Sequence, residues 1–362
     1  MPLRVRGLLP VVLAVVLAEV VASCGSPDEE TGAAKRTPAT TSQSPTEPTS
    51  APPPRRDAPR TTVTFVGDIM LGRGVAAAHP DDPIAPLRPM RPLLHGSDLT
   101  VGNLESALSD KGSPTQGDDS FAAVPRVVPA MGRLGVDALS LANNHTGDFG
   151  SAALLATVAA FRGTRVSAFG AGRDLRAAAR PVVLERHGIR FGFLGFNAIG
   201  ETPRATTDEP GALSVRMPPR TGPLDRTDLA RVLGAVRRLD RRVDVVVVMP
   251  HWGTQYTHRV EPAQRLVGRR LVDAGADLVV GGHPHWVQGT ERYRRATIAY
   301  SLGNFVFDMD FMQETMEGVA LTATFRGDRL RRVELTPYRL DDRFAPRLVH
   351  GAAARRIVAQ AR

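Results

Sequence analysis

The stretch VDVVVVMPHWG, residues 243–253, combines a strongly apolar run with polar residues directly after it. Between Val243 and Met249 only Asp244 interrupts the apolar side chains. Such a run is typical of a central strand whose two faces are both covered. His251 follows at the end of the run, so the stretch predicts a buried strand that presents a potential ligand at its carboxyl end.

The same pattern of strand and helix recurs on both sides of this stretch. Further strands are expected at residues 63–66, 98–101, 138–141, 190–196, 277–280, 297–301, 319–325 and 332–340. Helices are expected at residues 127–134, 151–162, 224–238 and 262–274. Alternation of strands with helices predicts a layered α/β fold with a mostly parallel core, and the closing strands predict an antiparallel portion.

Polar residues gather at the carboxyl ends of five of these strands, the edge where open α/β sheets bind ligands. The residues are Asp68, Asn103, Glu105, Asn144, His145, His251, His283 and His285. Taken singly, each is an ordinary turn former or a surface histidine. As a set, carboxylate, amide and imidazole groups suit a divalent first-row metal such as Zn, Mn or Fe. The absence of cysteine from the set argues against a structural zinc site.

His283 and His285 stand two residues apart at the end of one expected strand. Pleat geometry would point both side chains the same way, toward one metal or toward two neighbouring metals. Gly281 and Gly282 before them allow the backbone to turn and to approach a ligand closely.

The first 60 residues predict an export signal and a spacer. Arg4 and Arg6 precede a short apolar run, and Cys24 follows small residues, as in a bacterial lipoprotein signal at residues 1–24. The Ser-, Thr- and Pro-rich residues 25–60 predict a disordered tether. We therefore expect an extracytoplasmic protein anchored to the cell membrane by lipidation of Cys24. Glu19 is unusual for such a signal, and plain secretion or an uncleaved anchor are the alternatives.

The net charge is +9, and almost all of the positive charge is arginine. Codon bias explains an arginine excess, and so does attraction to a polyanion, because the guanidinium group binds carboxylate and phosphate at two points. No basic stretch interleaved with aromatic residues suggests base stacking, so nucleic acid is not an expected partner. Cys24 is the single cysteine, which excludes an internal disulfide.

Six short motifs carry a family resemblance. They are GDIMLGR (67–73), NLE (103–105), NNHTGDFG (143–150), HWG (251–253), GHPH (282–285) and SLGNF (301–305). In order and spacing they resemble the CapA family of bacterial capsule and poly-γ-glutamate synthesis proteins over residues 62–308. That family is similar to the calcineurin-like metallophosphoesterases. The resemblance implies a layered sandwich of two mixed β-sheets flanked by helices at residues 61–345, with residues 346–362 as a C-terminal tail.

The resemblance also implies roles for individual residues at a site for one or two metals. Asp68 and His285 would hold the first metal, and the second metal's ligands would be Asn144, His251 and His283. His145 would act beside the metals as proton donor or transition-state clamp, so His145 and Asp68 are the expected catalytic residues. For the bridging ligand, strand-end alignment indicates Asn103, whereas charge favours Glu105.

Three positions depart from the expected patterns. Met70 stands where a phosphoesterase has histidine, and a thioether is a poor ligand for hard cations. Gln255 stands where the family pattern has Glu, and Ala122 stands where Arg is expected. These departures weaken the first metal position and remove one anion contact.

Two functions from different classes fit the sequence. One is a metal-dependent hydrolase or transferase that acts on a capsular anionic polymer such as poly-γ-glutamate. The other is a non-catalytic factor that binds or helps to export that polymer, with the membrane and membrane synthase subunits as partners. A metal-dependent phosphodiesterase ranks below both. The chain has no Gly-x-x-x-x-Gly-Lys-Ser/Thr loop, so it does not carry out ATP-driven ligation itself.

Overall fold

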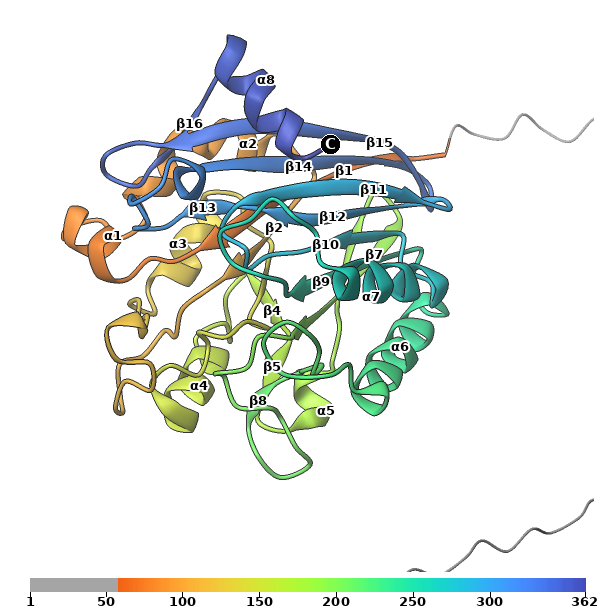
Figure 1. Cartoon of the computed structure of the whole chain (residues 1–362), viewed down its shortest axis with the longest axis horizontal. Helices are drawn as coiled ribbons and strands as arrows, with labels where there is room; N and C mark the ends of the chain where they lie inside the picture. Colours follow the sequence, from red (N-terminus) through yellow and green to blue (C-terminus); the bar gives the residue numbers. More distant parts are fainter. Residues whose placement is uncertain (1–57) are drawn as a thin grey trace, which may run out of the picture. The chain divides into compact units, whose positions relative to one another are not determined.

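The computed structural model describes residues 58–362 (Figure 1). The predicted signal, Cys24 and all but the last residues of the predicted tether lie outside the described residues. Within the described part, no helix combines the length and the apolar character needed to cross a membrane.

The first sheet has eight strands and joins the beginning of the described chain to its end. Its order is β16-β15-β14-β1-β2-β3-β4, and β13 also pairs with β1. The strands are β1 (Arg60–Ile69), β2 (Leu99–Leu104), β3 (Ala138–Ser140), β4 (Ser167–Phe169), β13 (Asn304–Val306), β14 (Glu317–Arg326), β15 (Arg329–Leu340) and β16 (Pro346–Leu348). Strands β1 to β4 run parallel, whereas β14 to β16 are antiparallel.

The second sheet has six strands in the order β11-β12-β10-β9-β7-β6. They are β6 (Val182–Arg186), β7 (Ile189–Asn197), β9 (Val245–His251), β10 (Leu278–Val280), β11 (Val287–Tyr293) and β12 (Ala296–Leu302). The four central strands are parallel and the outer two are antiparallel. A separate two-stranded pair joins β5 (Ala171–Gly172) to β8 (Gly211–Ala212).

Strand β9 shows why the valine run is continuous. Val245 and Val247 pack into the core between the two sheets, together with Phe193 of the neighbouring strand β7 and Phe65 of the other sheet. Val246 and Val248 alternate with them and belong to the core beneath the helices α6 (Arg226–Asp240) and α7 (Pro262–Asp273). Both faces of the strand are therefore buried, as the sequence predicts.

Helices flank the two sheets (Figure 1). Beside α6 and α7, they are α1 (Arg73–Ala78), η1 (Ala85–Met90), α2 (Arg91–His95), η2 (Gly117–Asp119), α3 (Val127–Arg133), α4 (Gly150–Ala159), α5 (Leu175–Ala178), η3 (Glu314–Met316) and α8 (Gly351–Gln360). Side chains of η1, α2 and α3 pack in one core with Val66 and Leu139 of the first sheet. The predicted class, two mixed sheets layered with flanking helices, is confirmed.

The C-terminal residues 346–362, expected only as a tail, are part of the folded unit. Strand β16 pairs with β15, and Ile357 of α8 is buried in the core between the sheets. The segment has too few large apolar residues to show a period in the sequence, so its docking depends on partners elsewhere in the chain.

Candidate metal centre

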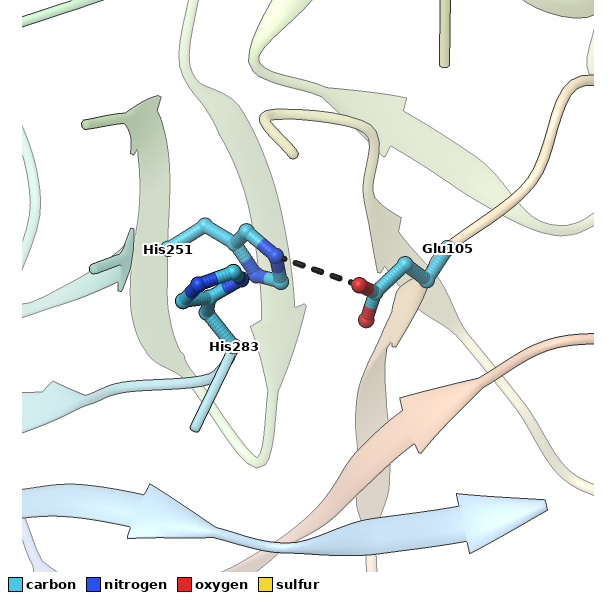
Figure 2. A group of neighbouring side chains, drawn as sticks. All are labelled: Glu105, His251 and His283. Carbon is cyan, nitrogen blue, oxygen red and sulfur yellow. Dashed lines mark ion pairs between the residues drawn. The ribbon is translucent and has the colours of Figure 1, made fainter. Parts of the chain in front are cut away.

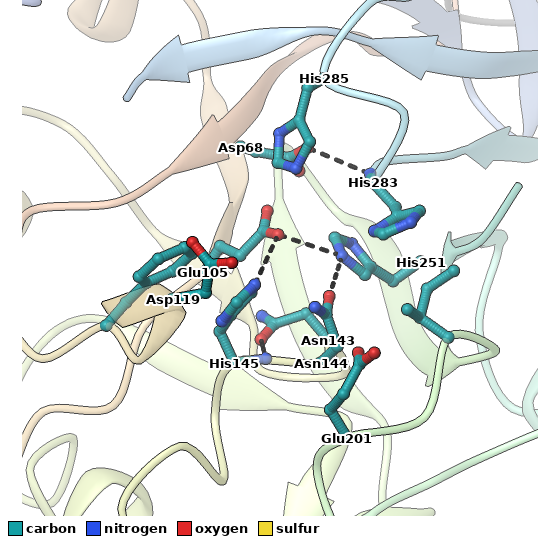
Figure 3. A network of polar contacts seen from close by, with 12 residues as sticks. Asp68, Glu105, Asp119, Asn143, Asn144, His145, Glu201, His251, His283 and His285 are labelled. Carbon is teal, nitrogen blue, oxygen red and sulfur yellow. Dashed lines mark hydrogen bonds and ion pairs between the residues drawn. The ribbon is translucent and has the colours of Figure 1, made fainter. Parts of the chain in front are cut away.

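The polar residues predicted at the strand ends converge on one buried place (Figure 3). Asp68 lies near the end of β1, opposite Asn103 of β2 in the parallel register. Glu105 follows β2, and His251 is the last residue of β9. Because the carboxyl ends of both parallel sets of strands meet here, residues far apart in the sequence become neighbours.

Two carboxylates form the base of the site, and both are fully buried. The Asn103 side-chain nitrogen donates to Asp68 Oδ1 at 2.8 Å and to Glu105 Oε2 at 3.2 Å. Glu105 Oε1 lies 3.3 Å from His251 Nε2 (Figure 2) and 4.0 Å from His145 Nε2. An amide thus holds the two acidic groups side by side, with imidazoles around them.

Burial changes the protonation of this set. It raises the pKa of Asp68 to about 7, helped by the charge of Glu105, and it raises the pKa of Glu105 to about 7 as well. Burial lowers the pKa of His251 to about 4 and that of His285 to about 3. It also lowers the pKa of His283 well below its usual range. The three imidazoles are therefore neutral near pH 7, with lone pairs available to a cation.

Several polar atoms of the site have no hydrogen-bond partner although they are buried. They are Glu105 Oε1, both ring nitrogens of His283, and His285 Nε2, half of the unpaired buried side-chain atoms in the described region. An unpaired buried polar group costs about 1–3 kcal/mol, so a concentration of them at one place indicates a missing ligand.

These atoms form two groups with the spacing of metal ligands. One group is Glu105, His251 and His283, and the other is Asp68, Glu105 and His285; in each, the ligand atoms lie within 4.8 Å of one another. Carboxylate and neutral imidazole are donors that first-row divalent ions accept. The residues present therefore fit a divalent metal, and Glu105 belongs to both groups.

The two predicted amides lie inside the site with different partners. Asn103 donates to the carboxylates, and its oxygen accepts from Asn143 Nδ2 at 2.9 Å. Asn144 Oδ1 lies 2.9 Å from His251 Nε2. Of the two candidates for the bridging position, the geometry favours Glu105, because Glu105 belongs to both ligand groups while the Asn103 nitrogen acts as a hydrogen-bond donor.

His145 has a partner that the sequence reasoning missed. Its Nδ1 lies 2.8 Å from Asp148 Oδ2, and the ring stacks on Phe121 with centroids 3.8 Å apart. Asp148 in turn accepts from the Phe121 backbone N–H at 2.6 Å and from Gln116 Nε2 at 2.5 Å. The result is a fixed ring whose Nε2 faces Glu105. Asp148 lies three residues after His145 in the motif NNHTGDFG, and this short spacing could have indicated the pair from the sequence.

The pleat argument for His283 and His285 was wrong. Strand β10 ends at Val280, and the two histidines adopt φ values of +95° and +58° in a loop. The His285 Nδ1 lies 2.8 Å from Asn304 Oδ1, and the two rings are inclined at 51°. Loop geometry therefore sends them to the two different ligand groups. At Gly282 the backbone lies close to Asp68, since a Cβ there would lie 2.5 Å from Asp68 Oδ1.

The three departing positions lie around the site. Met70 is fully buried in the apolar core, and its sulfur accepts from the Gly72 backbone N–H at 3.0 Å. Ala122 and Gln255 are half-buried. Beside Ala122, the Arg73 guanidinium lies 4.3 Å from the centre of the Phe121 ring, so a cation is present at this wall although residue 122 is not arginine.

Comparison with known proteins gives a consistent family relationship. The model of the family described as bacterial capsule synthesis protein PGA_cap matches residues 62–309. A Bacillus anthracis relative named capsule biosynthesis protein CapA is 35% identical over 266 residues, covering 71% of this chain and 62% of the relative. A Bacillus subtilis relative named PGA biosynthesis protein CapA is 29% identical over 281 residues, covering 76% of this chain and 70% of the relative.

Among solved structures, a Mycoplasma pneumoniae protein titled a novel phosphatase is similar at 11% identity with a TM-score of 0.48, covering 77% of this chain and 94% of that one. The chain spans less than two thirds of the length of the Bacillus anthracis relative. The family match covers most of the described residues and includes every candidate ligand. This chain therefore belongs to the PGA_cap family of bacterial capsule synthesis proteins.

Proposed function

We propose that the chain is an accessory protein in the synthesis, export or processing of a capsular anionic polymer of the poly-γ-glutamate type. We further propose that the candidate metal centre at the carboxyl ends of the strands holds one or two divalent ions, with Mn, Zn and Fe as candidates. One observation carries the metal proposal: the unpaired buried atoms of Glu105, His283 and His285 converge at one place. The names of the Bacillus relatives support the polymer.

In this proposal Glu105, His251 and His283 hold one ion, and Asp68, Glu105 and His285 hold the other. A divalent ion in such a site supplies Lewis-acid chemistry, polarising a carbonyl or phosphoryl oxygen. Asp148 accepts the proton on His145 Nδ1, which selects the tautomer whose Nε2 lone pair faces the ligands; once Nε2 has taken up a proton, Asp148 would stabilise the resulting imidazolium. This pair would protonate a leaving group during hydrolysis or transfer.

One observation favours the alternative, polymer binding without turnover: the site is closed, so a polymer chain has little access to the proposed metal ligands. Among the eight predicted site residues, the most exposed is Asn103 at 6%. A small cation fits such a place more readily than a polymer backbone does. The charge distribution supports an anionic partner in either case. Residues 1–57 hold equal numbers of acidic and basic side chains, so the entire net charge of +9 lies on the described residues.

We also propose that the protein is extracytoplasmic and anchored to the membrane by a lipid on Cys24. Residues 1–57 join the described domain at the start of β1, a strand of ten residues. Asp68 of the metal centre lies near the other end of the same strand. A strand of this length spans about 30 Å. Cys24→Ser should therefore move the protein from the membrane to the soluble fraction without changing its metal content. Retention of that variant in the membrane fraction would contradict the anchor.

Metal analysis of the full chain tests the centre directly. The protein is purified without chelators, offered Mn or Zn, and analysed by metal mass spectrometry. We expect one or two ions per chain. A chain that retains none of these ions would remove the hydrolase proposal and leave the polymer-binding factor.

A further inference from the structure

Two arginines near the metal centre differ in how fully their guanidinium groups are engaged. Arg73 donates to both oxygens of Asp308, at 3.2 and 2.5 Å, and also to Asp119 and to the Asp118 carbonyl, each at 3.2 Å. Arg220 donates to Glu201 Oε1 at 2.6 Å, and its side chain is 46% exposed. Arg73 is thus bound by several groups of the wall, whereas Arg220, within residues 58–362, has a side-chain hydrogen bond to Glu201 alone and is partly exposed.

Glu201, the ion-pair partner of Arg220, lies in the loop after β7, and both ends of this loop are hydrogen-bonded to segments that carry candidate ligands. After β7, the Ala198 backbone N–H donates to the His251 carbonyl at 2.9 Å. Thr202 Oγ1 accepts from the Gly147 backbone N–H at 2.9 Å. Between these two fixed points, the Glu201 carboxylate points toward Asn144 and His251 (Figure 3). Glu201 is therefore a defined feature at the border of the centre.

The turn that carries Arg220 is fastened to this loop. Thr221 Oγ1 accepts from the Met217 N–H at 2.8 Å, and its one proton is shared between the Met217 carbonyl at 3.0 Å and the Ala198 carbonyl at 3.3 Å. The Arg220 guanidinium group is thereby held beside the loop that carries Glu201.

We propose that Arg220 is the residue that binds a carboxylate of the substrate, and that Glu201 occupies it as an internal substitute until that carboxylate arrives. This inference rests on the proposed function, since it takes the substrate to be a polymer with glutamate-type carboxylates. The Glu201 side chain presents the same chemical group as such a polymer. Arginine binds carboxylate through two parallel hydrogen bonds, and an exposed ion pair contributes little to stability, so exchange of one carboxylate for another is facile.

Two substitutions make opposite predictions. Binding of a short γ-linked glutamate oligomer to the Mn-supplied full chain is measured by calorimetry. Arg220→Gln should weaken binding about tenfold, because it removes a charge-assisted pair. Arg220→Lys, which keeps the charge but loses the two-point geometry, should fall between that variant and the natural chain. Glu201→Gln should strengthen binding several-fold, because the internal competitor loses its charge.

The matched control is Arg237→Gln, which removes the same charge from an exposed position on α6. We expect this control to bind the oligomer like the natural chain. The proposal would be overturned if Arg220→Gln bound the oligomer as tightly as the natural chain, or if Glu201→Gln bound it more weakly. So would a natural chain that binds inorganic phosphate but not the oligomer.

Metal content measured on the same proteins separates the two proposals. Arg220→Gln should keep the natural metal content, because the arginine is not a ligand. If the natural chain binds no metal but the opposite effects of the two substitutions persist, the metal centre is wrong and the role of Arg220 stands. If metal is present and Arg220→Gln has no effect on oligomer binding, the role of Arg220 is wrong and the metal centre stands.

Discussion

Glu105 and Glu317 are both fully buried carboxylates, but their surroundings differ in one decisive respect. Glu317 Oε1 accepts from Arg339 at 2.7 Å and from Arg356, which join β14 to β15 and to α8. Glu105 has the Asn103 amide and the imidazoles of His145 and His251 as its neighbours. A buried charge with its own countercharge holds the fold together, whereas one without it is suited to receive a cation.

The pairing of Glu317 follows from sheet register. Glu317 and Arg339 are direct cross-strand partners in β14 and β15, and Arg356 reaches the same oxygen from α8. Glu105 instead follows the end of β2, where the described neighbours are imidazoles, an amide and Asp68, and neither Arg nor Lys forms an ion pair with it. Position at the carboxyl edge of the sheet therefore separates a ligand from a structural ion pair.

The largest expected difference between the two carboxylates is in metal binding. Glu105→Gln should lower metal affinity by more than about tenfold, since loss of even a supporting group around a metal has effects of that size. Glu317→Gln should leave metal content unchanged. Metal mass spectrometry of the two variants and the natural chain checks this. Equal metal loss in both variants would mean that the contrast is wrong.

The second difference is in stability without metal, where only the Glu317 substitution should be destabilising. In the presence of chelator, Glu317→Gln should lower the free energy of unfolding by about 1–2 kcal/mol, a value reduced because both arginines are partly exposed. Glu105→Gln should leave it unchanged or raise it by up to about 1 kcal/mol, because a buried, poorly compensated charge is removed. Denaturant unfolding gives both values.

The third difference is in pH dependence. Because the pKa values of Asp68 and Glu105 are raised to about 7, the metal-free protein retains protons on them up to that pH, and metal binding must displace these protons. In the metal-free protein, their raised pKa values contribute stability at acidic pH that is lost as the pH rises toward 7. The increase in melting temperature on adding Mn should therefore be small near pH 5 and grow through pH 7.

Melting curves with Mn and with chelator between pH 5 and pH 8 measure that increase. The Glu317→Gln variant should show the same pH profile as the natural chain. A metal-induced increase that is constant across this range would contradict the role of the two carboxylates as ligands.

The smallest expected effect is local and concerns α8. Arg356→Gln should leave metal content unchanged, because Arg339 still pairs with Glu317. It should weaken the docking of α8 by about 0.5–1 kcal/mol, as expected for a half-exposed ion pair. Backbone amide hydrogen exchange should then become faster in residues 351–360 and keep the rate of the unsubstituted chain around β9. Uniform acceleration over the whole domain would show that the helix is not an independent contributor.

The amino-acid sequence by itself determined the strand ends and the residues that they carry. Runs such as residues 243–249 predict buried strands because side-chain periodicity is a local property, and the polar residues after each run were therefore identifiable as one set. Membership of the family also followed from short motifs in their order. The tertiary structure alone decided which polar groups have countercharges.

No sequence pattern shows that Glu317 is paired; only the register of β15 and the docking of α8 give Glu317 its two arginines. The loop conformation that sends His283 and His285 to different ligand groups also depends on non-local contacts, including the hydrogen bond between His285 and Asn304. Arg220 meets Glu201 because two loops lock together beside the sheet. Such pairings join residues distant along the chain, and no local pattern encodes them, because they form only when the sheets and helices pack together.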